Sequence, residues 1–225
     1  MNDRRVLYII LSSTITILLL YLVEQHLKVN YLFKSLSKII LFIIIPYLYI
    51  KILNKDTLWK HMKFKKDNNL RYGIILGVSS FVIVILTFMF VKDYINIADI
   101  ISELENKSKI NPTNFILVGL YIIFINSFLE ELFFRGFVFL NLYKLGHRKL
   151  GYIFSSLLFS LYHITIFQTW FNIYLTSLAL VGLITIGLIF NYVDTKSQNF
   201  LNSWIIHILA DCAIIAIGIK LLGIV

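Results

Sequence analysis

The sequence has little of what a soluble domain needs on its surface. Only 15% of its 225 residues are charged, and it contains two prolines, ten glycines and a single cysteine, Cys212. Soluble domains are about a quarter charged, so the low charge excludes an ordinary soluble surface. The scarcity of proline and glycine leaves no usual linker between domains. The lone cysteine excludes a fold that depends on an intramolecular disulfide.

Apolar residues are what the chain has in abundance. They make up 59% of it and lie in long blocks, where a soluble helix would show a stripe. A membrane-spanning helix needs about 20 such residues. The blocks predict an all-α, polytopic transmembrane bundle of about seven spans, at 6–23, 36–53, 72–91, 115–143, 150–168, 172–192 and from 200 to the C-terminus.

The spans divide the chain into two parts. Residues 1–114 contain three predicted helices, a basic loop at 51–71 and a polar segment at 92–114. We expect that segment to be a loop with a short amphipathic helix. Residues 115–225 contain four predicted helices and the dense cluster of charge. The second part is therefore the predicted catalytic core, and the first part is expected to serve as scaffold or substrate-access helices.

The net charge of +9 reflects membrane topology rather than a nucleic-acid partner. Lysines and arginines lie in short loops between apolar blocks, and no basic patch with interleaved aromatics occurs. They are more numerous at the N-terminus and in the second, fourth and sixth loops than on the opposite side, where Lys38 is counted, and this predicts a cytoplasmic N-terminus. The loop at 51–71 is expected to contact anionic lipid. Asn, Ile and Lys are abundant, which is typical of proteins from AT-rich bacterial genomes. We therefore expect a bacterial cell membrane as the location.

Lys38 and Lys51 are interpreted as flanks of the second span. Four other charged residues lie well inside the predicted spans: Glu130, Glu131, Arg135 and Asp211. Each ionised group costs roughly 2.5–3.5 kcal/mol at the centre of a helix in the membrane, which points to a function. Glu131 and Arg135 are four residues apart, so they share a helix face and can pair. Glu130 points about 100° away from Glu131 and is free to face another helix.

Two histidines, His163 and His207, also lie well inside predicted spans. Helix geometry allows them to reach the same depth as Glu130. A carboxylate and an imidazole can take a proton from water and return it to a leaving amine. A second imidazole or Asp211 can polarise the scissile carbonyl. Alternatively, Glu130 and the two histidines form a three-ligand metal site with an open water position. The local HExxH zinc motif is absent.

Three short motifs occur in order on three predicted helices: EExxxR at Glu130, Glu131 and Arg135, FxxxH at Phe159 and His163, and HxxxD at His207 and Asp211. Together they resemble the CAAX-protease and bacteriocin-processing family of intramembrane endopeptidases, also called Abi. The resemblance covers about residues 115–215. The last motif is a variant of HxxxN, and the acid in place of the amide changes its charge.

The resemblance implies Glu130 as the general base, with His163 helping to activate water. It implies that His207 and Asp211 stabilise the oxyanion or polarise the site. The other motif residues would support the site: Glu131, Arg135 and Phe159. We prefer a mechanism without a required cofactor, because no cysteine or further acidic ligand joins the cluster, but a divalent metal such as zinc stays open as an alternative.

The substrate implied by the resemblance is a membrane-associated peptide or protein. Eukaryotic members cut prenylated CAAX proteins, and bacterial members are linked to peptide or bacteriocin processing and to self-immunity. The composition favours the bacterial role. Two other classes of function remain open at this stage. One is a transporter or proton relay, which also uses buried acids and histidines. The other is a non-proteolytic scaffold that regulates a membrane partner.

Overall fold

The computed structural model describes residues 2–27, 29–54 and 70–224, and within these ranges every regular element is helical. Among these described residues, seven helical stretches are long and apolar enough to cross a membrane: Asn2–Gln25, Tyr31–Leu53, Arg71–Tyr94, Phe115–Lys144, Arg148–Trp170, Ile173–Ser197 and Leu201–Leu221. The predicted all-α bundle of about seven spans is confirmed.

Six of the spans are built mainly from single helices. These are α1 (Asn2–Gln25), α2 (Tyr31–Tyr49), α4 (Arg71–Val91), α9 (Arg148–Tyr162), α11 (Ile173–Ser197) and α12 (Leu201–Leu221). A π-helical turn, η1 (Ile50–Asn54), extends α2, a 3₁₀ turn, η2 (Lys92–Tyr94), extends α4, and α10 (Ile164–Trp170) extends α9. Helix α5 (Ile97–Asn106) lies in the polar segment, where the sequence predicted a short amphipathic helix.

The fourth span is composite. It runs through α6 (Phe115–Leu120), η3 (Tyr121–Asn126), α7 (Ser127–Glu130), η4 (Glu131–Phe139) and α8 (Leu140–Lys144). The segments η3 and η4 are π-helical. Such wide turns are rare and occur frequently at functional sites.

The second span begins earlier than predicted. Helix α2 starts at Tyr31 rather than at 36, because the side chain of Asn30 accepts a hydrogen bond of 3.1 Å from the backbone N–H of Phe33. An asparagine at this position satisfies a backbone donor at the helix start. As a result, Lys38 lies within the span instead of at its flank. Residues 55–69 of the predicted basic loop lie outside the described residues.

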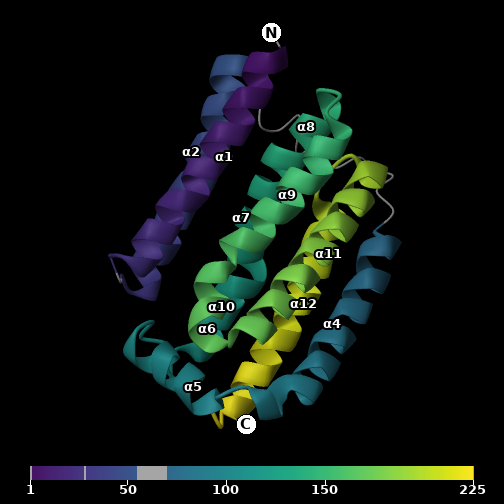
Figure 1. Ribbon diagram of the computed structural model, residues 1–225. Coiled ribbons are helices and arrows are strands. Elements are labelled where there is room, and N and C mark those ends of the chain that lie inside the picture. Colours follow the sequence, from purple (N-terminus) through teal and green to yellow (C-terminus); the bar gives the residue numbers. More distant parts are fainter. Residues whose placement is uncertain (1, 28, 55–69, 225) are drawn as a thin grey trace.

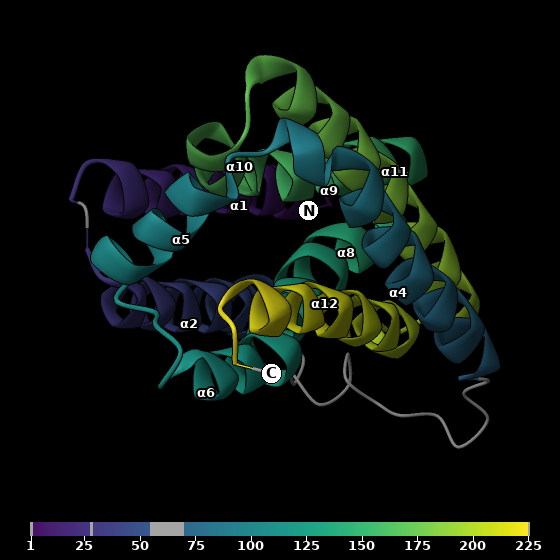
Figure 2. The same ribbon diagram turned by 90° about the horizontal axis from the view of Figure 1, so that it is seen from below.

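Figure 1 shows the arrangement of the helices, with the N- and C-termini at opposite ends of the bundle. Helices α1 and α2 run side by side, α9 packs on α11, and α4 packs on α12. Seen from below, α2 lies on the side of α6 and α12, while α1 lies on the side of α9 (Figure 2). The first two helices therefore flank the helices that carry the three motifs.

Two glycines allow α4 to approach α12 closely. The N–H of Gly73 donates to Asn202 Oδ1 at 3.0 Å. A Cβ on Gly77 would lie 2.5 Å from Leu209 Cδ1 and 3.4 Å from the backbone of Ile205 and Ile206. Small residues four apart bring helices together in membranes, where apolar burial alone gives little drive for association.

Aromatic side chains fill the space between α2, η4 and α9. The ring of Phe42 stacks on Phe133 with centroids 4.2 Å apart, and it meets Phe134 edge-on at 5.7 Å. Tyr162 joins the same group, with its ring 5.6 Å from Phe134. These side chains are buried. They fix α2 against the helix that carries the acidic motif, and this positions the site beside them.

Candidate active site

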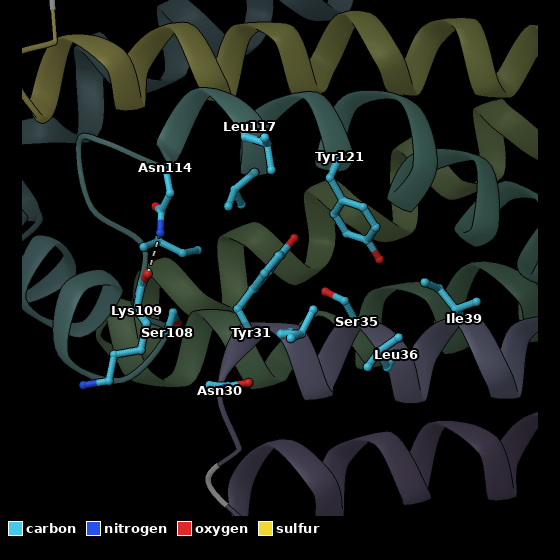
Figure 3. A pocket seen from close by; sticks show the side chains of 13 residues that line it. Asn30, Tyr31, Ser35, Leu36, Ile39, Ser108, Lys109, Asn114, Leu117 and Tyr121 are labelled. Atoms are coloured by element: carbon cyan, nitrogen blue, oxygen red, sulfur yellow. Dashed lines mark hydrogen bonds between the residues drawn. The ribbon is translucent and has the colours of Figure 1, made fainter.

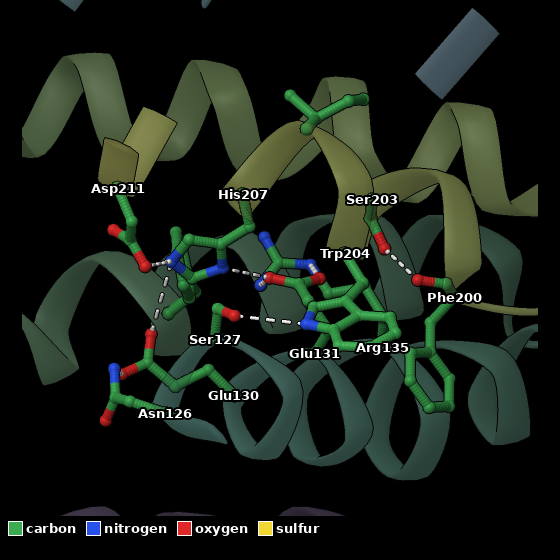
Figure 4. A network of polar contacts seen from close by, with 12 residues as sticks. Asn126, Ser127, Glu130, Glu131, Arg135, Phe200, Ser203, Trp204, His207 and Asp211 are labelled. Carbon is green, nitrogen blue, oxygen red and sulfur yellow. Dashed lines mark hydrogen bonds and ion pairs between the residues drawn. The ribbon is translucent and has the colours of Figure 1, made fainter. Parts of the chain in front are cut away.

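The structure brings the predicted reactive side chains together from three spans. Glu130 ends α7, His163 lies at the break between α9 and α10, and His207 and Asp211 lie one turn apart on α12. The Oε2 atom of Glu130 is 3.7 Å from His163 Nε2 and 3.9 Å from His207 Nε2. Figure 4 shows Glu130, His207 and Asp211 facing one another.

The two carboxylate oxygens of Glu130 have different surroundings. Oε1 accepts hydrogen bonds from Asn126 Nδ2 at 2.9 Å and from Lys38 Nζ at 3.1 Å. Oε2 is buried and has no hydrogen-bond donor among the described residues. Glu130 is only 2% exposed, so its carboxylate is shielded from bulk water. Its Oε1 atom is fixed by the two donors. The other oxygen faces the two imidazoles.

The hydrogen bond of His163 determines which of its ring nitrogens carries a proton in the neutral form. Its Nδ1 lies 2.8 Å from the carbonyl oxygen of Phe159. A carbonyl can only accept, so Nδ1 must be the donor. The Nε2 atom of the neutral ring then has a lone pair directed toward the side of Glu130. Glu130 Oε2 and His163 Nε2 are thus two proton acceptors side by side.

His207 is held from the opposite side of its ring. Its Nδ1 lies 2.8 Å from Glu131 Oε1, and because a carboxylate oxygen accepts, this nitrogen donates. Its Nε2 faces Glu130 Oε2 at 3.9 Å and Asp211 Oδ2 at 3.7 Å. Glu131 therefore orients the ring, while Asp211 lies on the side of the reactive groups.

The predicted supporting residues form a buried ion pair. Arg135 Nε is 3.2 Å from Glu131 Oε2, and Arg135 Nη1 donates to Glu131 Oε1 at 3.2 Å. Both residues are fully buried. The guanidinium also lies over the rings of Phe159, at 4.0 Å, and Phe190, at 4.8 Å. Cation–π contacts of this kind favour a desolvated cation. Phe159 thus contacts the ion pair as well as the ring of His163.

Sequence reasoning missed one cation of the cluster. Lys38 Nζ donates to Glu130 and, at 2.5 Å, to Asn126 Oδ1, and it lies 4.9 Å from the ring centre of Tyr162. The charge was treated as a flank of the second span. Its position eight residues after Asn30, a good helix cap, was the signal that it lies inside a helix.

Two further polar pairs near the cluster were also not assigned from the sequence. Asp194 is fully buried at the end of α11 and accepts from Ser203 Oγ at 2.8 Å. Trp204 Nε1 donates to Ser127 Oγ at 3.1 Å (Figure 4). Both pairs tie α12, which carries His207, to its neighbours, so we assign them a structural role.

Two features of the cluster bear on a bound metal ion. Among the described residues, no group of three or more His, Cys, Asp and Glu side chains has the geometry to hold one. The ammonium group of Lys38 is hydrogen-bonded to Glu130, so a divalent ion on this carboxylate would have to lie beside a positive charge.

A cavity of about 340 Å³ lies between α2 and the start of the fourth span. Figure 3 shows Tyr31, Ser35 and Ile39 on one side and Leu117 and Tyr121 on the other. The lining is apolar over most of its area. The cavity-lining residues Ser35, Leu36 and Ile39 are close to Lys38 along α2. Because Lys38 pairs with Glu130, the cavity lies along the helix that contacts this acid.

Residues 112–213 match the family model described as type II CAAX prenyl endopeptidase Rce1-like. The matched segment contains all three motifs, from Glu130 to Asp211, and confirms the resemblance drawn from them. No curated protein and no solved structure matches the chain. The seven apolar helices and this match identify an integral membrane protein whose site-bearing segment is similar to a family of proteases.

Proposed function

We propose that the protein is an intramembrane endopeptidase, since residues 112–213 match the Rce1-like family model of CAAX endopeptidases. Its substrate is a membrane-associated peptide or protein, and the nucleophile is a water activated by Glu130 and His163. The observation that carries the proposal is the position of Glu130 Oε2. This oxygen is buried, accepts no hydrogen bond from the described residues and lies within 4 Å of two imidazole nitrogens.

A water molecule that donates to Glu130 Oε2 is also within reach of His163 Nε2, because the two acceptors are 3.7 Å apart. Donation to both would leave an oxygen lone pair of the water directed away from them, toward a scissile carbonyl. As this oxygen bonds to the carbonyl carbon, one of its protons passes to Glu130. The π electrons of the carbonyl move onto its oxygen, which becomes an oxyanion.

Collapse of this tetrahedral intermediate breaks the C–N bond. Glu130 gives its proton to the nitrogen, and the products are a carboxylic acid and an amine. His207 Nε2, when protonated, is placed to donate to the oxyanion, with Glu131 holding the opposite nitrogen. Asp211 faces the same Nε2 and adjusts the charge around it. No step in this scheme needs a metal ion.

The apolar surroundings of the site support a substrate segment that lies within the bilayer. The apolar cavity beside α2 suits an aliphatic side chain of a substrate segment within the bilayer. The composition of the chain favours a bacterial substrate, so we place peptide or bacteriocin processing and self-immunity ahead of cleavage of a prenylated protein.

The test compares wild type with Glu130→Gln in cells that lack the native copy. The substitution keeps the size of the side chain and removes the base. Quantitative mass spectrometry of membrane-protein and secreted-peptide termini, at equal expression, should show termini that occur with wild type and vanish with Glu130→Gln. A loss of at least about 100-fold is expected for an essential acid–base group. The termini also identify the substrate.

Two further arms separate the rival readings. Termini that persist with Glu130→Gln, together with an unchanged phenotype, would overturn the protease and favour a scaffold. Uptake or proton flux that depends on Glu130, without new termini, would favour a transporter. Cleavage by the purified protein should survive a chelator such as EDTA; loss of cleavage that zinc restores would overturn the metal-free mechanism.

A further inference from the structure

Lys38 is a charged residue in a part of the chain outside the matched segment. It lies on α2, within the apolar span Tyr31–Leu53, and is 6% exposed. A lysine at such a position is costly in a bilayer unless its charge is compensated. Snorkelling to the interface is the usual solution for a lysine near the end of a span. Here the side chain turns inward to the acid cluster instead.

The contacts of Lys38 form a closed set with Glu130 and Asn126. The ammonium donates to Glu130 Oε1 and to Asn126 Oδ1, and Asn126 Nδ2 donates to the same Glu130 oxygen. A lysine has no acceptor, so the amide of Asn126 can only turn its oxygen toward Lys38 and its nitrogen toward Glu130. Both donors thus hold one carboxylate oxygen, and the other is left facing the imidazoles.

The pairing of charges in the cluster also indicates a role for Lys38. Arg135 is paired with Glu131 on the other side of the helix. Among the described residues, Lys38 is the lysine or arginine paired with Glu130. Its ammonium also lies over Tyr162, the residue before His163. Lys38 therefore touches both the proposed base and the helix that carries the second proton acceptor.

We propose that Lys38 is a positioning residue for the proposed reaction: it neutralises Glu130 and fixes Oε1, so that Oε2 is directed at the water and at the two histidines. The proposal rests on the proposed function. It gives the N-terminal helices a part in the chemistry, because α2 supplies the cation of a base that lies on the fourth span. It also accounts for a carboxylate that is buried within the bundle beside a compensating positive charge.

The test uses the full-length protein in lipid vesicles and, as substrate, the peptide identified by its Glu130-dependent termini. The variants are Lys38→Met, Lys38→Arg and Lys38→Gln. We expect Lys38→Met to lower kcat at least about 100-fold with KM within about threefold, since a misplaced catalytic group costs rate rather than binding. Lys38→Arg, which keeps the charge, should recover part of kcat.

Lys34→Met is the matched control, because Lys34 lies one turn earlier on α2 and pairs with Glu24 instead of Glu130. It should leave kcat within about threefold of wild type. Lys38→Gln retains a donor for Glu130 while it loses the charge. If Lys38→Met fails to fold, Lys38→Gln carries the test, with an expected fall in kcat of at least about tenfold.

The outcomes distinguish this inference from the proposed function. Wild-type kcat in Lys38→Gln or Lys38→Met, with Glu130→Gln inactive, would overturn the role of Lys38 and leave the protease intact. A rise in KM with unchanged kcat would also overturn it, because Lys38 would then bind substrate. Cleavage that persists in Glu130→Gln would remove the proposed function itself.

Discussion

Two neighbouring carboxylates, Glu130 and Glu131, have separate tasks because the helix directs them to different partners. Glu131 Oε1 accepts from Arg135 Nη1 and from His207 Nδ1, and its Oε2 lies 3.2 Å from Arg135 Nε. Glu130 Oε1 accepts from Lys38 and Asn126, and Glu130 Oε2 faces Nε2 of both histidines. The first arrangement orients a ring, and the second is suited to accept a proton. Removal of Glu131 should therefore disturb the orientation of the His207 ring, whereas removal of Glu130 should abolish proton transfer.

Asp211 is the residue whose role the structure leaves most open to a direct test. Its Oδ2 faces His207 Nε2 at 3.7 Å and has no hydrogen-bond donor among the described residues. Asp211→Asn places an amide donor there, and we expect cleavage within about tenfold of wild type. Asp211→Ala removes the group, and we expect a loss of about 100-fold or more, as for a lost oxyanion-stabilising group. Initial rates on the identified peptide measure both effects.

Asp93→Asn serves as the control for Asp211, since it makes the same chemical change at an exposed position near the end of a span. It should not alter the rate. Equal and severe losses in Asp211→Asn and Asp211→Ala would show that the negative charge itself is needed. Wild-type rates in both would assign Asp211 to packing alone.

That Glu130, His163, His207 and Asp211 lie together could largely be predicted from the sequence, because buried polar side chains are costly in a membrane. Charged and imidazole side chains are so unfavourable in a span that Glu130, His163 and His207 stood out, and helix periodicity set their directions. Lys38 did not stand out, because a lysine near the edge of an apolar block is ordinarily an interfacial flank. Its role depends on where α2 begins, and the cap at Asn30 determines that.

At the scale of elements, the fourth span shows what an apolar pattern does not determine. The sequence predicted one continuous helix at 115–143, and the structure has π-helical turns in it at η3 and η4. A membrane span is apolar on most of its faces, so its hydrophobicity does not separate an α-helix from a π-helix. Glu131 begins η4 and Asn126 ends η3. The short α7 between the two segments carries Glu130, so the wide turns adjoin the proposed base on both sides.

The contact of α4 with α12 gives a prediction about stability. Leucine at Gly77 would place its Cβ against Leu209 and against the backbone of α12, and it would push the two helices apart. We expect Gly77→Leu to lower the free energy of unfolding by about 1–3 kcal/mol, the usual cost of overpacking. Thermal unfolding in detergent micelles measures the change.

Gly182→Leu is the matched control for Gly77→Leu. Gly182 lies on α11, and a Cβ there meets no atom within 4 Å. The substitution should leave the unfolding temperature unchanged or raise it slightly, because leucine favours a helix over glycine. Equal effects of the two substitutions would show that the close approach of α4 to α12 does not contribute to stability.

At the scale of the molecule, the two parts of the chain, residues 1–114 and 115–225, contribute side chains to one hydrophobic core. The aromatic group around Phe42 joins α2 to η4 and α9, and it adjoins the cluster through Tyr162. Long-range packing of this kind leaves no mark in the local sequence pattern, since any apolar side chain satisfies the pattern of a span. The number and order of the helices were therefore predictable, while the contribution of α2 to the site was not.

The orientation of the bundle in the membrane stays a prediction, and the structure strengthens its basis. Lys38 was counted with the loops opposite the N-terminus, but its charge is buried and paired, so it no longer belongs in that count. The remaining excess of lysine and arginine lies on the side of the N-terminus, which is expected to be cytoplasmic.

Single cysteines in a Cys212→Ala background test this orientation, because Cys212 is the only cysteine of the chain. Asn106→Cys, at the end of α5, and Lys149→Cys, at the start of α9, are both at exposed positions at opposite ends of the bundle. In intact cells, a membrane-impermeant maleimide should label Asn106→Cys, while Lys149→Cys should react only after lysis. The Cys212→Ala parent should not react in either case. The reverse pattern would place the N-terminus outside.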